Sequence, residues 1–90
     1  MARYLVERTF PDGLAIPVTD EGAETCLTLI DNNAVDGVTW IQSYVTPDKR
    51  KMFDIYDAPS PEAIRLAAQR NSLPVDRITP VSVLDPYFYR

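Results

Sequence analysis

The feature that most constrains the fold is a pair of β-rich runs, Val38 to Thr46 and Arg50 to Asp57, with only a short polar segment between them. That segment is Pro47, Asp48 and Lys49. Runs rich in Val, Ile, Tyr, Trp and Phe are typical of strands, and a connection this short permits only antiparallel pairing. The sequence therefore predicts a β-hairpin in the middle of the chain.

One strand and one helix are expected before the hairpin. Arg3 to Phe10 is rich in Tyr, Leu, Val and Phe and ends at a Pro-Asp-Gly turn, which favours a strand. Thr19 and Asp20 can each cap the helix that follows. Apolar residues recur along this helix every three or four positions and are expected to face the core. They are Ala23, Leu27, Ile30 and Ala34.

A second helix and a last strand are expected after the hairpin. Ser60 suits an N-cap and Pro61 the first helical position, and a face of small apolar residues follows. Ile78 to Leu84 predicts a strand, in which Pro80 has no backbone donor and so indicates a sheet edge or a bulge. The resulting order, βαββαβ, predicts a single α+β domain over residues 1–90. This order is that of the ferredoxin-like sandwich, with one antiparallel sheet and both helices on one face.

The composition excludes several classes of function. The chain has no His, one Cys and a net charge of −4, from 9 basic and 13 acidic residues. Without His, the Ser-His and Cys-His nucleophile pairs and every His-ligated metal site are excluded. The scattered basic residues do not make a surface for nucleic acid, and no apolar run approaches the ~20 residues that span a bilayer. We therefore expect a cytoplasmic protein without nucleic-acid or membrane partners, and we assign no cofactor and no metal ligand.

The alternation of side chains along the hairpin predicts two apolar faces. One is assigned to the helices and carries Ile41, Val45, Phe53 and Ile55. The opposite face then carries Val38, Trp40, Gln42, Tyr44, Met52, Asp54 and Tyr56. An aromatic surface of this size is unusual on a monomer, so a second copy is expected to cover it in a homodimer. The alternative is an open sheet with a solvated aromatic face.

Polar and aromatic groups on that second face form the candidate ligand-binding site. They are Glu7, Trp40, Gln42, Tyr44, Asp54 and Tyr56. In a partly dry cavity, desolvation raises the pKa of a carboxylic acid and suits it to acid–base chemistry. Alternatively, the two carboxylates are satisfied by Arg3, Arg8 or tyrosine hydroxyls, and for Asp54 we expect such a pairing. No catalytic residue is assigned.

Three segments resemble a family of small bacterial proteins of unknown function. They are Trp40–Val45, Met52–Arg65 and Leu73–Ile78, within a resemblance that spans roughly Val38 to Pro86. Some members of that family are described as nickel-binding, and the family is similar to the dimeric α+β barrels, in which two ferredoxin-like protomers pack sheet against sheet. The resemblance therefore implies this fold and nickel binding. Nickel ligands in such proteins are expected to be His, so none is carried over to this chain.

Two hypotheses about function follow. The first is a non-enzymatic protein that binds a small ligand or a metal ion in or near the barrel cavity of the dimer. The second, implied by the barrel architecture, is a cofactor-free monooxygenase or isomerase that acts on an aromatic or lactone substrate in that cavity. The lack of His favours binding, because proton transfer in such cavities commonly uses an imidazole.

Overall fold

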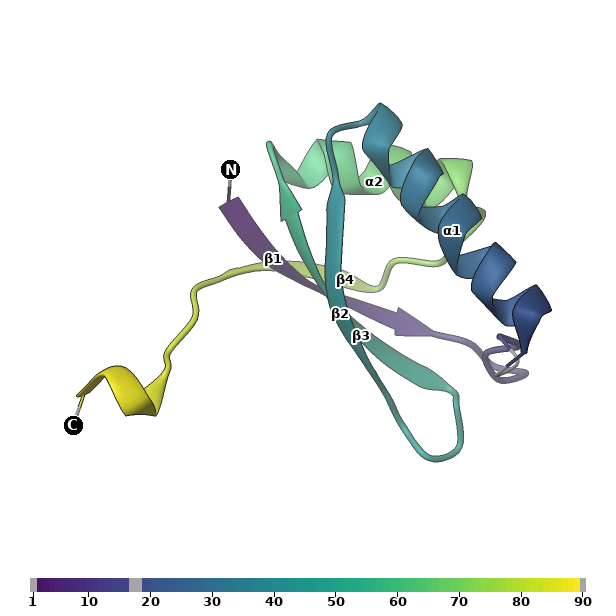
Figure 1. Ribbon diagram of the computed structural model, residues 1–90, viewed down its shortest axis with the longest axis horizontal. Coiled ribbons are helices and arrows are strands. Elements are labelled where there is room, and N and C mark those ends of the chain that lie inside the picture. The colour runs from purple at the N-terminus through teal and green to yellow at the C-terminus, as the bar shows by residue number, and fades with distance from the viewer. Residues whose placement is uncertain (1, 17–18, 90) are drawn as a thin grey trace.

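The computed structural model describes residues 2–16 and 19–89 and forms a four-stranded sheet covered by two α-helices (Figure 1). The elements are β1 (Ala2–Thr9), α1 (Asp20–Val35), β2 (Thr39–Val45), β3 (Lys51–Ala58), α2 (Pro61–Arg70), β4 (Arg77–Val81) and the 3-10 helix η1 (Pro86–Tyr89). This order confirms the predicted α+β ferredoxin-like fold. Within the described residues, no helix is long and apolar enough to cross a membrane.

The strands lie in the order β2-β3-β1-β4 and every neighbouring pair is antiparallel. Pro80 lies on β4, which is an edge strand, as its missing backbone donor predicts. The sequence predicts that this strand continues to Leu84, but it ends at Val81. The residues after it leave the sheet and lead away from the body of the molecule to η1 (Figure 1).

Both helices begin at the caps that the sequence predicts. The Thr19 hydroxyl accepts a hydrogen bond from the Gly22 N–H at 3.4 Å, and the Ser60 hydroxyl accepts one from the Ala63 N–H at 3.2 Å. Pro61 occupies the first helical position of α2, where a missing N–H costs nothing. These caps satisfy backbone donors that would otherwise lack a partner at each helix start.

The core lies between the sheet and α2. Its buried members are Tyr4, Val6, Val38, Tyr56, Ala58, Ala63, Ile64 and Ala67. Three of them come from α2, and the small side chains of Ala63 and Ala67 allow this helix to lie close to the strands. The predicted apolar face of α2 is therefore confirmed.

The predicted core face of α1 is wrong. The stripe expected to face the core is exposed, with Leu27 61% and Ile30 45% accessible. The residues that turn inward are Gly22, Cys26, Leu29 and Asn33, which also recur every three or four positions. This inward face contains a glycine and an asparagine, so its hydropathy is no higher than that of the outward face, and periodicity alone selects the wrong side.

The predicted orientation of β3 is also wrong. Met52, Asp54 and Tyr56 are buried beneath the helices, whereas Phe53 and Ile55 lie on the face that no helix covers. Alternation correctly places the first three residues on one side, but the strand is central and apolar on both sides. The sequence pattern therefore does not mark which side meets the helices.

A β-bulge in β2 adds a second departure from simple alternation. Trp40 lies opposite Tyr56, but the register then shifts, so that Gln42 lies opposite Ile55 and Ser43 opposite Asp54. Trp40 and Ser43 are consequently on the helix side of the sheet, and Gln42 is on the uncovered side. A bulge inserts one extra residue and so reverses the alternation that follows it.

Candidate binding site

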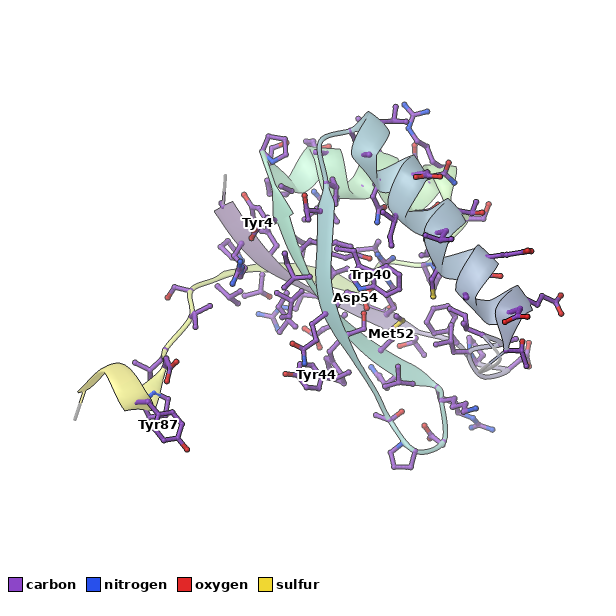
Figure 2. All side chains as sticks on the ribbon, viewed as in Figure 1. Tyr4, Trp40, Tyr44, Met52, Asp54 and Tyr87 are labelled. Atoms are coloured by element: carbon purple, nitrogen blue, oxygen red, sulfur yellow. The ribbon has the colours of Figure 1, made fainter. Side chains whose placement is uncertain are left out.

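The sheet separates the six candidate residues into two groups. Trp40, Asp54 and Tyr56 lie on the helix side, and Glu7, Gln42 and Tyr44 lie on the uncovered face. Figure 2 labels Trp40 and Asp54 close together between the sheet and the helices, with Tyr44 farther along the hairpin. The expectation that all six line one cavity is therefore wrong, because β3 has the opposite orientation and β2 contains a bulge.

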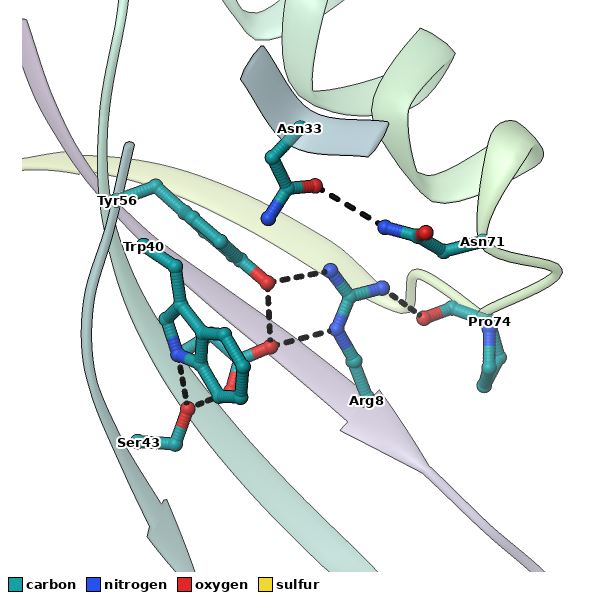
Figure 3. Close-up of polar contacts among 8 residues, drawn as sticks. Arg8, Asn33, Trp40, Ser43, Tyr56, Asn71 and Pro74 are labelled. Atoms are coloured by element: carbon teal, nitrogen blue, oxygen red, sulfur yellow. Dashed lines mark hydrogen bonds and ion pairs between the residues drawn. The ribbon is translucent and has the colours of Figure 1, made fainter. Parts of the chain in front are cut away.

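Asp54 is the centre of a buried polar cluster on the helix side (Figure 3). It is 0% exposed, and Arg8, at 2% exposed, donates from Nε to one carboxylate oxygen at 2.7 Å. The Tyr56 hydroxyl donates to the same oxygen at 3.0 Å, and the Ser43 hydroxyl donates to the other. Three donors thus compensate for the loss of hydration, which confirms that Asp54 pairs with a donor.

The cluster extends to two more elements. Trp40 Nε1 donates to the Ser43 hydroxyl at 2.7 Å, which fixes the indole beside β3. Arg8 Nη1 donates to the Pro74 carbonyl at 2.7 Å, so the guanidinium also holds the segment before β4. Arg8 Nη2 reaches the Tyr56 hydroxyl at 3.3 Å. One ion pair therefore connects β1, β2, β3 and the loop that follows α2.

The chemistry of the cluster is that of a structural support. Burial, and then the negative charge of Asp54, raise the pKa of the Tyr56 hydroxyl far above its ordinary value, so it stays a neutral donor. Both Asp54 oxygens already accept hydrogen bonds from Arg8, Ser43 and Tyr56. A carboxylate that is this fully engaged is poorly placed to accept a proton from a substrate.

Asn33, on α1, is a further buried polar residue and is drawn with this cluster in Figure 3. Its Oδ1 accepts from Asn71 Nδ2 at 3.1 Å, and Asn71 in turn accepts from Asn32 at 2.8 Å. Its Nδ2 has no hydrogen-bond partner among the described residues. These bonds connect α1 to the end of α2. Sequence reasoning missed the roles of Asn33 and Ser43, since neither a helical Asn nor a strand Ser is distinctive by itself.

The uncovered face of the sheet has an apolar centre with polar neighbours. Two rows cross it: Gln42, Ile55, Leu5 and Thr79 in one, and Tyr44, Phe53, Glu7 and Arg77 in the next. Gln42 Nε2 donates to the Tyr44 hydroxyl at 3.0 Å. Three of the predicted site residues are therefore brought together here, beside Leu5, Phe53 and Ile55.

A partly exposed ion pair lies in the next row of the uncovered face. Arg3 donates from Nε and Nη2 to the two carboxylate oxygens of Asp57, at 2.8 and 3.1 Å. These hydrogen bonds hold the pKa of Asp57 below its ordinary value. Unlike the Arg8–Asp54 pair, both partners remain in contact with water.

A family model described as nickel responsive protein SCO4226-like matches residues 4–81 of the chain. The chain belongs to this SCO4226-like family. The match confirms the family resemblance carried by the hairpin and the second helix. A search of curated proteins returns no match.

A solved member of the SCO4226-like family has the same architecture. The crystal structure of SCO4226 from Streptomyces coelicolor A3(2) superposes with a TM-score of 0.74, covering 93% of this chain and 100% of that one. The two sequences are 17% identical over the alignment. At this identity, the similarity establishes the shared fold alone, and the chemistry of this chain has to be argued from its own residues.

Proposed function

We propose that this chain is a non-enzymatic binding protein that forms a homodimer through its uncovered sheet face and holds a small ligand against that face. The observation that carries the proposal is the make-up of the face. Leu5, Phe53 and Ile55 lie at its centre, and carboxylate, amide and hydroxyl groups lie beside them. Binding sites commonly combine an apolar floor with a few polar groups that orient the ligand.

A second copy is the partner that best accounts for the uncovered face. Each Å² of apolar surface removed from water stabilises by about 25 cal/mol, and two copies related by a two-fold axis bury the same patch twice. The segment after β4 offers more apolar surface, with Val83 67% and Leu84 75% exposed. It extends away from the body (Figure 1), and the radius of gyration, 13.7 Å, exceeds the roughly 12 Å typical of a compact chain of this length.

The polar groups define what the face can hold. Glu7 offers a carboxylate, Gln42 an amide, and Tyr44 a phenol next to the Phe53 ring. This set suits a small, partly apolar molecule with at least one hydrogen-bond donor. Catalysis by a cofactor-free oxygenase or isomerase is the weaker candidate, because the best-placed acid of the sequence, Asp54, lies on the other side of the sheet in a saturated ion pair.

Nickel is the metal that the family description suggests for this chain, and the residues present do not fit it. Nickel sites favour imidazole and thiolate ligands. The chain has no His and a single Cys, Cys26. Across residues 2–16 and 19–89, no three side chains from His, Cys, Asp or Glu gather closely enough to hold an ion. The proposal therefore includes no nickel site.

Light scattering on the purified chain tests the dimer. We expect twice the chain mass of 10.2 kDa at micromolar concentration, and a 10.2 kDa particle would contradict the proposal. Ile55→Lys introduces an ammonium at the centre of the face and should yield folded monomer, as judged by circular dichroism. Leu27→Lys makes the same charge change on the exposed side of α1 and should leave the dimer intact.

Native mass spectrometry of protein purified without chelator tests the ligand. We expect a retained small molecule on the wild-type dimer and its loss in Gln42→Ala, whose side chain reaches the Tyr44 hydroxyl. Arg50→Gln, in the β2–β3 turn, is the control and should retain it. Retention of the same mass by all three proteins would place the ligand elsewhere than on the uncovered face.

A further inference from the structure

The exposed side of α1 carries a row of apolar residues, which we call the α1 stripe. Its members are Ala23, Leu27, Ile30 and Ala34, and all four are exposed. Leu27 and Ile30, at the centre of the stripe, are 61% and 45% accessible. Both helices lie on one side of the sheet, so the stripe lies on the other side of the sheet from the uncovered face and the proposed dimer surface (Figure 1).

The spacing of the α1 stripe is that of a contact between two helices. Its members follow one another after four, three and four residues. This alternation keeps a row of side chains facing a neighbouring helix, as in a coiled-coil seam. Large side chains occupy its centre and alanines its two ends, where small side chains let a second helix approach closely. The stripe therefore has the pattern of one half of a helix pair.

A row of carboxylates runs beside the α1 stripe. Its members are Asp20, Glu24 and Asp31, and all three are exposed. Two of them directly follow a member of the stripe in sequence, which puts them at its margin. Across residues 2–16 and 19–89, none of the three carboxylates makes an ion pair or a hydrogen bond, whereas Asp36, just after α1, pairs with Arg70 at 2.9 Å. The charges that border the stripe are therefore uncompensated.

The charge around the α1 stripe selects the chemistry of its partner. Residues 9–48 contain seven acidic residues and no Lys or Arg, so complementarity requires a basic partner. A second copy that presented the same helix would place carboxylates against carboxylates, which disfavours pairing. The other helix of the chain, α2, uses its apolar face in the core. The occupant that fits the stripe is therefore a different protein.

We propose that the α1 stripe docks a basic amphipathic helix of another protein. Apolar side chains of that helix pack on Leu27 and Ile30, and its Lys or Arg side chains flank the seam and pair with Glu24 and Asp31. Helix-on-helix recognition of this kind uses apolar anchors for affinity and flanking charges for the choice of partner. The contact uses no group of the uncovered sheet face, so the proposal does not depend on the proposed function.

A synthetic peptide added to the ¹⁵N-labelled chain tests the proposal through amide chemical shifts. The probe has about 16 residues, with Leu at the spacing of the stripe, Lys at the flanking positions and Ala elsewhere. We expect saturable shifts confined to α1 and weaker binding when NaCl is raised from about 50 to about 500 mM. A peptide with Glu in place of each Lys, and a basic peptide with the Leu positions scrambled, should each bind at least tenfold more weakly.

Matched variants assign the binding to the α1 stripe. Leu27→Lys should weaken binding of the basic peptide by roughly tenfold or more, whereas Leu66→Lys, the same change at a 50% exposed position of α2, should leave it unchanged. Glu24→Gln should weaken it by about two- to fivefold and Glu62→Gln, on α2, should not. Circular dichroism checks that each variant is folded.

Three results would overturn the proposal. The first is equal binding of the basic peptide and its Glu counterpart, and the second is equal affinity of Leu27→Lys and Leu66→Lys for the basic peptide. The third is a wild-type particle larger than a dimer in light scattering that shrinks in Leu27→Lys, because a second copy would then cover the stripe. A monomeric wild type that binds the basic peptide would contradict the proposed dimer and leave this docking surface supported.

Discussion

Asp54 and Arg8 are charged groups that the fold buries almost completely, and their surroundings explain how this is possible. A buried ion pair is tolerated when its remaining hydrogen-bonding capacity is also used. Here the Ser43 and Tyr56 hydroxyls donate further hydrogen bonds to the Asp54 carboxylate, and the Arg8 guanidinium donates one more to the Pro74 carbonyl. The pair therefore stabilises mainly by holding separate elements in one arrangement, and removing one partner leaves the other charge uncompensated.

Asp54→Asn should lower the free energy of unfolding by roughly 2–5 kcal/mol, because Arg8 then keeps a buried charge without its carboxylate partner. Urea denaturation monitored by circular dichroism measures the loss. Asp57→Asn is the matched control, since it makes the same change three residues along β3 in a pair open to water, and it should have a much smaller effect. Equal losses in the two variants would remove any special role for the buried pair.

Tyr56 predicts a specific loss of stability at high pH. Its pKa is raised from 10.0 in the folded chain, so above about pH 10 the unfolded chain ionises this phenol and the folded chain does not. The stability that depends on the neutral phenol is complete below this pH and is lost as the pH rises further. Thermal unfolding at about pH 9 and pH 11 should therefore show a smaller decrease in melting temperature for Tyr56→Phe than for wild type.

Tyr44→Phe is the control for that experiment. Tyr44 is 58% exposed on the uncovered face, so the loss of its hydroxyl should leave the decrease in melting temperature between the two pH values as it is in wild type. If Tyr56→Phe and wild type lose the same number of degrees, the Tyr56 phenol ionises in the folded chain as readily as in the unfolded one. That result would contradict the raised pKa of Tyr56 and its assignment as a permanently neutral donor to Asp54.

At the scale of single elements, the sequence indicates where helices and strands begin and end, but it indicates only weakly which of their faces is buried. The helix caps, the proline at the start of α2 and the hairpin all follow from residue types that act on the nearest backbone. Orientation depends on contacts between distant segments. Asn33 faces inward because Asn71, at the end of α2, hydrogen-bonds to it, and no local pattern in α1 indicates that partner.

Substitutions at two nearby leucines test which face of α1 meets the core. Leu27→Lys should change the free energy of unfolding by less than about 0.5 kcal/mol, because that side chain is 61% exposed. Leu29→Lys should destabilise by roughly 1–3 kcal/mol, because Leu29 lies on the inward face with Gly22 and Asn33. Chemical denaturation compares them directly. A larger loss for Leu27→Lys would restore the orientation that hydropathy predicted.

At the scale of the whole molecule, the order of elements was predictable and the division of the site was not. The order βαββαβ follows from the hairpin and its flanking helix signals, and short antiparallel connections leave few other topologies. The candidate site depended on which side of β3 meets the helices and on a bulge after Trp40. Neither is encoded in the alternation, since both sides of β3 carry large apolar residues.

Nickel binding depends on all the potential ligand groups of the chain together. The SCO4226-like family is described as nickel responsive, but this chain offers carboxylates, carbonyls and one thiol, a set that suits harder ions better. Isothermal titration of the purified chain with nickel should therefore give no stoichiometric site of submicromolar affinity. Cys26→Ser is the matched variant, because it removes the only thiol of the sequence with little change in shape. A tight nickel site in wild type would contradict the exclusion of nickel. If that site disappears in Cys26→Ser, the thiol is a ligand and recruits further ligands from a second copy. If it persists in Cys26→Ser, carboxylates or the terminal amine are the ligands.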